Sequence, residues 1–205
     1  MNVGLMLHRI TDPRDPILPD WLDLYQYKFP LSEQVLVSTF LHALNAESEA
    51  SLRLLAILRE NRLVGMACWE LCAEAKTGYL WYLAAEPEGQ GIGSWTYRQI
   101  LRQLETEAPD AVALVFEVER PEDAHDEETR VQATRRIAFY ETKGALLCGG
   151  IEYSQDVGWQ PPVPMHLMIH PLPGIDLNEQ WAADILAGVF GEAVQGVDKL
   201  ALLRS

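Results

Sequence analysis

The hydrophobic pattern of this chain changes several times between the period of a strand and the period of a helix. Short apolar or alternating runs predict strands over residues 4–10, 52–58, 63–71, 79–85, 111–120, 145–154 and 165–170. Apolar residues at steps of three and four predict helices over residues 21–28, 31–44, 92–107 and 131–143. A further helical stripe lies in residues 174–205. This order of elements predicts a mixed α/β (α+β) fold.

Local signals refine the ends of several elements. Ser32 is a candidate N-cap for the second helix, and Gly144 stands where a left-handed C-cap would end the helix of residues 131–143. Residues 59–62 predict a hairpin turn in which Asn61 takes a left-handed conformation. Residues 45–51 read as a polar link. These signals agree with the hydrophobic pattern.

Residues 78–98 read as a buried strand, a glycine-rich loop and a helix. This is the physical recipe for a phosphate-binding loop, because glycines allow close backbone approach and the first amides of a helix attract anions. A Walker loop is excluded, since the loop has no lysine, and the spacing G-x-G-x-G differs from the dinucleotide fingerprint G-x-G-x-x-G. The loop therefore belongs to another class of phosphate-binding site, or is a plain glycine-rich turn.

The loop resembles motif A of the GNAT superfamily of N-acetyltransferases, written Arg/Gln-x-x-Gly-x-Gly/Ala. Gly91 and Gly93 match the two small positions, whereas Glu88 replaces the usual Arg or Gln. The resemblance implies acetyl-coenzyme A as cosubstrate, with its pyrophosphate on backbone amides. The implied cofactor-binding residues are Ala84, Ala85, Gly89, Gln90, Gly91, Ile92, Gly93 and Ser94.

A second segment, residues 139–145, resembles the Phe/Leu-Tyr-Glu-x-x-Gly-Phe motif of the same superfamily. Tyr140 matches the tyrosine that often protonates the departing coenzyme A, and Gly144 matches the glycine. Ala145 replaces the final Phe. The residue-level alternative is that Tyr140 is a core aromatic on the face of its helix.

The strand Phe116-Glu-Val-Glu-Arg120 resembles the Leu-Glu-Val-Arg strand of ribosomal-protein N-terminal acetyltransferases. The resemblance implies that Glu117 is the general base, whereas the alternative is an ordinary polar strand face. Glu70 and Glu86 are further candidates. An acidic loop is predicted at residues 121–130, and Glu117 to Glu128 holds seven carboxylates. It replaces the family's Asn-x-x-Ala segment and weakly favours a cationic acceptor.

The GNAT resemblance implies a mixed central sheet of about six to seven strands flanked by about four helices. We expect a GNAT domain over residues 1–173 and a C-terminal helical extension over residues 174–205. The apolar stripe of that extension predicts packing either on the domain or at a homodimer interface. Residues 11–51 and 121–130 are those that the resemblance associates with acceptor choice.

Composition and charge limit the kinds of partner and cellular location that the sequence predicts. The net charge of −14 over 205 residues argues against a nucleic-acid partner, and no apolar run reaches the ~20 residues of a membrane span. The N-terminus does not read as a signal peptide, and three scattered cysteines favour a reducing cytoplasm. His166 and His170 fall on a predicted strand ~13 Å apart, so no metal is predicted.

The leading hypothesis is an N-acetyltransferase that moves acetyl from acetyl-CoA directly to a primary amine in a ternary complex. The acceptor is a small cationic amine or a peptide amine. One alternative is an acyl-CoA-binding sensor or structural protein of the same fold. The other is a nucleotide-binding enzyme with a similar glycine loop.

Overall fold

The computed structural model describes residues 4–45 and 51–203, and the chain forms two compact units. The first unit comprises Met1–Leu71, Leu80–Pro109 and Val157–Pro161, and the second comprises Cys72–Tyr79, Asp110–Asp156 and Pro162–Ser205. The chain therefore passes between the units several times, and residues 174–203 belong to the second unit. The predicted polar link lies mostly outside the described residues, at 46–50.

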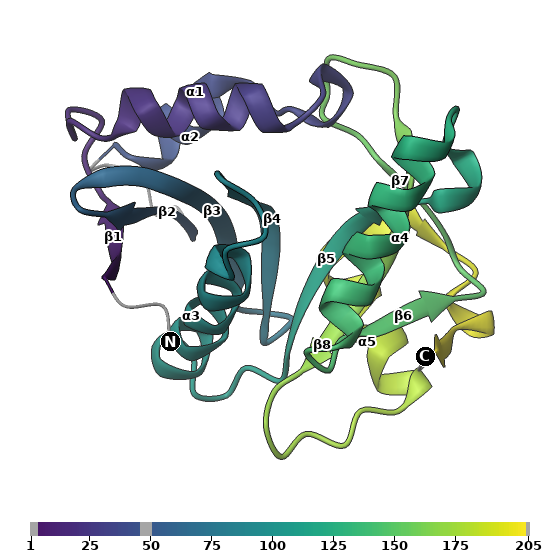
Figure 1. Ribbon diagram of the computed structural model, residues 1–205. Helices are drawn as coiled ribbons and strands as arrows, with labels where there is room; N and C mark the ends of the chain where they lie inside the picture. The colour runs from purple at the N-terminus through teal and green to yellow at the C-terminus, as the bar shows by residue number, and fades with distance from the viewer. Residues whose placement is uncertain (1–3, 46–50, 204–205) are drawn as a thin grey trace. The chain divides into compact units, whose positions relative to one another are not determined.

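The first unit has the strand order β1-β2-β3-β4. Its elements are β1 (Leu5–Ile10), α1 (Leu18–Lys28), α2 (Val37–Ala43), β2 (Leu52–Arg59), β3 (Arg62–Cys72), β4 (Thr77–Ala85) and α3 (Ile92–Glu107). The first three residues of β4, Thr77 to Tyr79, belong to the second unit. Helices α1 and α2 cover one face of these strands through buried Trp21, Tyr25 and Phe40 (Figure 1). Helix α3 covers the other face, where Trp69 of β3 donates to Gln103 at 3.2 Å.

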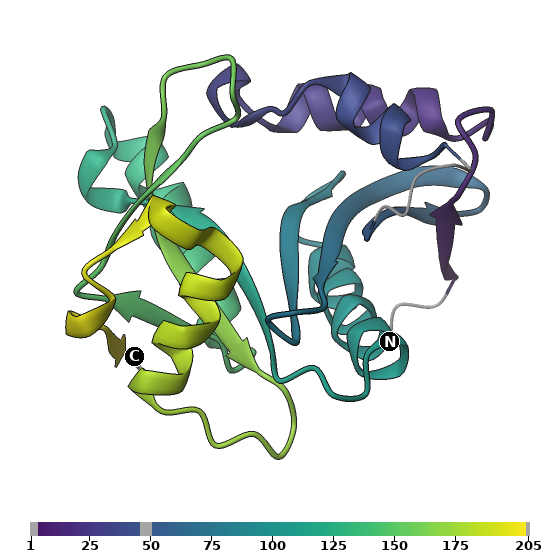
Figure 2. The ribbon, with the colours of Figure 1, turned by 180° about the vertical axis from the view of Figure 1, so that it is seen from behind.

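The second unit has the strand order β5-β8-β6-β10. Its elements are β5 (Ala113–Glu119), α4 (Glu127–Glu141), β6 (Leu146–Gly149), β7 (Glu152–Gln155), β8 (Val163–Pro171), α5 (Glu179–Phe190), β9 (Val194–Gln195) and β10 (Ala201–Leu203). Helix α4 lies in front of these strands in Figure 1, and α5 lies behind them, as Figure 2 shows from the other side. Strand β7 pairs with both β8 and β9.

Several local predictions are confirmed. The helix predicted over 92–107 has these bounds, Asn61 has φ 61°, and Gly144 has φ 100° after α4. Helix α4 begins at Glu127, earlier than predicted, because the Asp126 carboxylate caps the amide of Thr129 at 2.7 Å. Part of the predicted acidic loop is therefore the first turn of a helix.

The N-cap predicted at Ser32 is wrong. Ser32 lies in a short 3-10 turn, Leu31–Glu33, and α2 begins at Val37 without a side-chain cap. The Gln34 side chain explains the turn, because its amide donates to the carbonyls of Phe29 at 2.6 Å and Gln26 at 3.2 Å. These hydrogen bonds tie residue 34 back to the end of α1.

The fold class is confirmed as mixed α/β, but the described residues hold ten strands and five α-helices, more strands than predicted. The run at 145–154 divides at Gly150, where φ is 78°, into β6 and β7. After α5 the chain forms strands β9 and β10, where we expected helix throughout the extension. Buried Val194 and Leu200 join the core of the second unit.

Candidate functional site

The glycine loop follows β4 and leads into α3. Gly89 and Gly91 have φ of 77° and 72°, in the left-handed region that a side chain disfavours, and Gly91 is the N-cap of α3. The first hydrogen bond within the helix runs from the amide of Trp95 to the carbonyl of Gly91 at 3.0 Å. The amides of Ile92, Gly93 and Ser94 precede that bond, and such amides bind anions at helix N-termini.

Only some of the predicted cofactor-binding residues present a side chain at this loop. The Ile92 and Ala84 side chains are buried at 1% and 8% exposure, so these two residues offer mainly backbone groups. Gly65 of β3 allows close packing here, since a Cβ at that position would lie 3.0 Å from the carbonyl oxygen of Ala84. The Gln90 side chain accepts a hydrogen bond from Arg59 at 2.6 Å.

Two carboxylates lie at the entrance to the loop. Lys28, the last residue of α1, forms an ion pair with Glu86 and another with Glu88, the latter at 3.3 Å. Glu86, a candidate base from the sequence, is thus held by a lysine in the structure. No local signal predicts that Lys28 lies beside the loop, because 60 positions separate it from Glu88.

Tyr140 lies in the last turn of α4 and is 7% exposed. Its ring lies 4.3 Å from the ring of Phe116 on β5. Burial raises the pKa of Tyr140 to about 12, with Arg136 lowering it and Glu119 raising it further. The phenol therefore carries its proton at neutral pH, as a proton donor must.

Glu117 is the centre of a partly buried hydrogen-bond cluster, which we call the Glu117 cluster. Tyr79 donates to Glu117 at 2.9 Å, Gln155 donates at 3.2 Å, and Tyr153 donates to its other carboxylate oxygen. Burial raises the pKa of Glu117, while the hydrogen bonds from Tyr153, Tyr79 and Gln155 oppose that rise. A carboxylate with a raised pKa is a better proton acceptor than an exposed one.

The Glu117 cluster is covered by an aromatic side chain of the C-terminal segment. The Phe190 ring at the end of α5 lies 5.2 Å from the ring of Tyr79 and 4.9 Å from that of Tyr153. Sequence reasoning did not find Tyr79, Tyr153, Gln155 or Phe190. One signal in the sequence could have placed two of them together: Tyr153 and Gln155 are two residues apart on a strand and so point to the same face.

The structure does not bring Glu117 and Tyr140 to the same face of β5. Phe116 contacts Tyr140 under α4, whereas the next residue, Glu117, contacts Tyr153 and Tyr79 on the side of α5. Adjacent side chains of a strand point to opposite faces. The side chains of Glu117 and Tyr140 therefore lie on opposite faces of β5, within the second unit.

The remaining carboxylate candidates also have partners. Glu70 accepts hydrogen bonds from Ser51 at 2.5 Å and from the indole of Trp81 at 3.2 Å. Glu119 is paired with Arg136, but its Oε2 is buried and has no hydrogen-bond partner within the part of the chain that the structure describes. Glu117 is therefore the candidate with the most strongly perturbed environment among these carboxylates.

The acidic segment carries less free negative charge than its sequence suggests. Glu122 lies 3.0 Å from His166 and 3.3 Å from Arg120, which also contacts Asp123 at 3.0 Å. Glu127 is paired with Arg130 within α4. The acidic segment therefore gives weaker support for a cationic acceptor than its sequence suggests.

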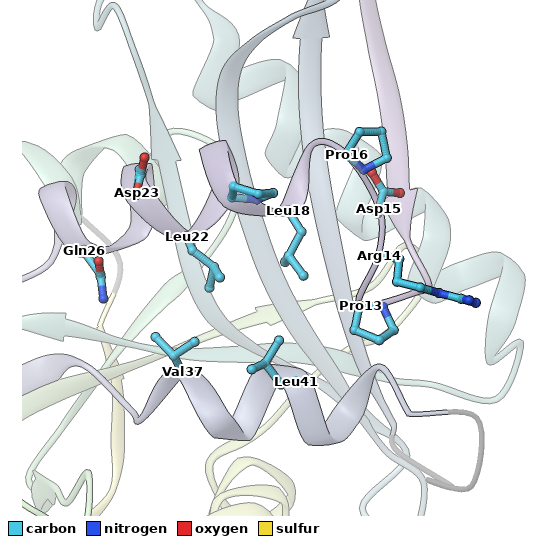
Figure 3. A pocket seen from close by; sticks show the side chains of 11 residues that line it. Pro13, Arg14, Asp15, Pro16, Leu18, Leu22, Asp23, Gln26, Val37 and Leu41 are labelled. Atoms are coloured by element: carbon cyan, nitrogen blue, oxygen red, sulfur yellow. The ribbon is translucent and has the colours of Figure 1, made fainter.

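A hollow of about 600 Å³ lies within the first unit, between α1 and α2. Figure 3 shows Leu18 and Leu22 of α1 facing Val37 and Leu41 of α2 across it. Asp15 and Asp23 also line it. The hollow falls within residues 11–51, the region that the sequence resemblance associates with acceptor choice.

Neither a metal cluster nor a membrane-spanning helix is found in the described parts of the chain. Over residues 4–45 and 51–203, no three His, Cys, Asp or Glu residues are grouped as a metal site would require. No described helix combines the length and the apolar character needed to cross a bilayer. His166 pairs with Glu122, and burial lowers the pKa of His170 to about 4.

No protein-family model and no curated protein matches the sequence. Solved structures do match. A Bacteroides thetaiotaomicron protein assigned to the GNAT acetyltransferase family aligns with a TM-score of 0.68 and 20% identity, over 90% of this chain and 97% of its own. A GNAT family acetyltransferase from Elizabethkingia anophelis, solved with acetyl-CoA bound, aligns with a TM-score of 0.55 and 15% identity, over 83% and 99%.

A third solved structure that matches is a ribosomal-protein N-acetyltransferase. The ribosomal-protein-S18-alanine N-acetyltransferase from Escherichia coli aligns with a TM-score of 0.53 and 16% identity, over 84% of this chain and 99% of its own. Identities this low carry the fold and no residue roles. The resemblance read from the sequence is confirmed at that level: this chain has the fold of the GNAT-superfamily acetyltransferases.

Proposed function

We propose that this protein is an N-acetyltransferase that transfers acetyl from acetyl-CoA directly to a primary amine. The observation that carries the proposal is the left-handed Gly89 and Gly91 before α3, on the fold of the acetyltransferases. Backbone amides at residues 91–94 would hold the pyrophosphate of the cosubstrate. Ala84, Ala85, Gly89 and Gln90 complete the proposed cofactor-binding segment.

The proposed reaction has balanced proton transfers. The amine nitrogen attacks the thioester carbonyl carbon, so that a C–N bond forms and the C–S bond breaks. Tyr140 donates a proton to the departing thiolate, and Glu117, which lies on the opposite face of β5, accepts the proton of the amine through water. The raised pKa of Glu117 and the pKa of about 12 of Tyr140 support these roles.

For the acceptor, we propose a small cationic amine or a peptide amine. The similar E. coli protein acts on an alanine of ribosomal protein S18, which is a peptide amine. The hollow between α1 and α2 is lined by apolar side chains together with Arg14, Asp15 and Asp23. Asp15 already contacts His8, so Asp23 is the carboxylate that we propose meets an alkyl amine. Substitutions in this hollow, such as Leu22→Trp, should change acceptor preference and leave acetyl-CoA affinity unchanged.

A second candidate function is acyl-CoA binding without transfer. Two observations favour it: Glu88 replaces the motif's Arg or Gln, and the Glu117 carboxylate already accepts three hydrogen bonds. A fully hydrogen-bonded carboxylate can serve structure alone. In that case acetyl-CoA would bind, but the addition of an amine would not release the coenzyme A thiol.

We also propose a cytoplasmic location and a homodimer. The location is supported by three free cysteines, two of them buried. Trp181 and Leu203 of the C-terminal segment remain 37% and 46% exposed, which supports a contact with a second copy. Light scattering on the purified chain measures the oligomeric state, and a monomer at high concentration would rule out the dimer.

One experiment tests the function and separates the candidates. The melting temperature is measured with acetyl-CoA, NAD or ATP, and thiol release is then followed across a panel of amines. Ligand at ~100 times its dissociation constant stabilises by about 2.7 kcal/mol, which is several degrees for a chain of this size. A selective shift with thiol release supports the enzyme, and a selective shift without release supports the binding protein. A shift with NAD or ATP alone would contradict both.

A further inference from the structure

The glycine loop carries a negative charge where the family motif carries a cation or an amide. Glu88 stands at the Arg/Gln position, and its side chain is 82% exposed at the loop. A carboxylate at this position repels the phosphates of a coenzyme A. Backbone amides alone would have to overcome that repulsion, in a chain whose net charge is already −14.

Two cations from outside the loop lie against it. Lys28 pairs with both Glu86 and Glu88, and only 17% of its side chain is exposed. Arg59, the last residue of β2, donates to Gln90 at 2.6 Å. All these residues belong to the first unit, so the contacts lie within one compact body.

Lys28 is well placed to stay charged and to face an anion. Burial acts to lower its pKa, but hydrogen bonds to Glu86 and Glu88 outweigh this and raise the pKa. Lys28 also ends α1, and a helix C-terminus stabilises a cation. Its partner Glu88 is mostly exposed, and ion pairs with exposed partners are weak. A phosphate can therefore displace this carboxylate at small cost.

We propose that Lys28 and Arg59 supply the phosphate-facing charge that the loop motif lacks, and that Glu88 competes with the phosphates for Lys28. Binding of acetyl-CoA then exchanges the Lys28–Glu88 ion pair for a Lys28–phosphate contact. Glu88 acts as a built-in competitor that weakens cofactor binding. This inference rests on the proposed function, because it assumes that the loop binds a coenzyme A.

Calorimetric titration of acetyl-CoA into five single variants tests the exchange. We expect Lys28→Met to raise Kd about tenfold, Arg59→Met to raise it severalfold, and Lys28→Arg to keep most of the affinity. Glu88→Gln, which restores a family residue, should lower Kd severalfold. The matched control is Arg102→Met, an exposed cation on α3 away from the loop, which should leave Kd unchanged.

The double variant Lys28→Met/Glu88→Gln isolates the competition. If Glu88 acts through Lys28, the gain from Glu88→Gln shrinks when Lys28 is absent. An equal gain in both backgrounds would show direct repulsion and overturn the exchange. Wild-type affinity retained in Lys28→Met would overturn the role of Lys28 while leaving the proposed function intact. Absence of binding by the wild type would overturn the proposed function itself, and this inference with it.

Discussion

The glycine loop and the Glu117 cluster are built in opposite ways. The loop is a continuous segment, residues 86–94, whose binding groups are mainly backbone amides next to an exposed turn. The Glu117 cluster is assembled from β4, β5, β7 and α5, and its groups are partly buried side chains. On our proposal, the loop receives a ligand, whereas the cluster sets the pKa of one carboxylate.

The two regions therefore differ in how a mutation should act. A backbone site is damaged by changes in main-chain conformation, and side-chain charge affects it through the few residues that lie against it, here Lys28, Arg59 and Glu88. A buried cluster of side chains depends on every donor, because each unmet hydrogen bond leaves a desolvated group. Variants in the loop should change binding, and variants in the cluster should change turnover and its pH dependence.

The largest effect is expected from Glu117→Gln, which removes the proposed base but keeps the shape of the side chain. Turnover should fall by about 10²–10⁴, with acetyl-CoA affinity unchanged. In the wild type, turnover should rise with pH through a pKa above the usual value of a glutamate, because burial favours the protonated form. Initial rates of thiol release measure both.

The control for this variant is Glu119→Gln, another carboxylate of the same strand, paired with Arg136. We expect a much smaller loss of turnover there. Equal losses in the two variants would mean that Glu117 has no special role. Wild-type turnover in Glu117→Gln would remove the base assignment.

Tyr140→Phe should have the next largest effect, because it removes only the hydroxyl of the proposed proton donor. Turnover should fall about 10²-fold, and the dissociation constant of acetyl-CoA should stay within about twofold. Kinetics of thiol release, paired with calorimetry, measure the two quantities. Tyr27→Phe, at a tyrosine that is 77% exposed, is the control and should behave as wild type. An unchanged rate of thiol release in Tyr140→Phe would mean that Tyr140 only packs in the core.

Gly91→Ala tests whether acetyl-CoA binding depends on the backbone conformation of the glycine loop. The new Cβ would strain a residue with φ 72°, at a cost of about 1–2 kcal/mol, or would shift the loop. We expect acetyl-CoA affinity to fall about tenfold or more in titrations. Gly158→Ala is a matched control, since it has φ 83° and open space around its Cβ, far along the chain from the loop. It should lose similar stability but bind normally. Equal affinity losses in both variants would point to general destabilisation.

The smallest effect on binding and turnover is expected from His170, a buried titratable group outside both regions, which acts on stability at acid pH. Burial lowers its pKa from 6.5 to about 4, so the unfolded chain binds a proton first as the pH falls. His170 therefore stabilises the fold fully above about pH 6.5, and up to about 3 kcal/mol is lost towards pH 4. Denaturant unfolding at several pH values should show a shallower acid decline for His170→Gln. An identical decline would mean that His170 is not buried as a neutral group.

Contiguous features of this molecule could be predicted from its sequence, and remote ones could not. The bounds of α3 and the left-handed conformations of Asn61 and Gly144 all follow from signals within a few residues. The C-cap of α4 is Thr142, two residues before the predicted Gly144. The Ser32 cap failed because the Gln34 side chain, with its bonds to Phe29 and Gln26, decided the local geometry. Local propensity is a weak guide where such tertiary contacts intervene.

The same limit applies to the candidate site. Motif spacing predicts Glu117 and Tyr140 as catalytic residues, but it does not indicate on which face of β5 each side chain lies. Tyr79 and Gln155 join Glu117 only through the folded sheet, and Lys28 reaches the loop only through the packing of α1. The strands β9 and β10 were missed because each has three residues or fewer, too short for a hydrophobic period to register.

The central claim is that acetyl-CoA binds at the glycine loop, and amide hydrogen exchange with and without acetyl-CoA tests it most directly. We predict that saturating acetyl-CoA slows exchange in peptides covering residues 89–95, and that NAD and ATP leave those peptides unchanged. Unaltered exchange there, at an acetyl-CoA concentration that raises the melting temperature, would place the ligand elsewhere and contradict the account.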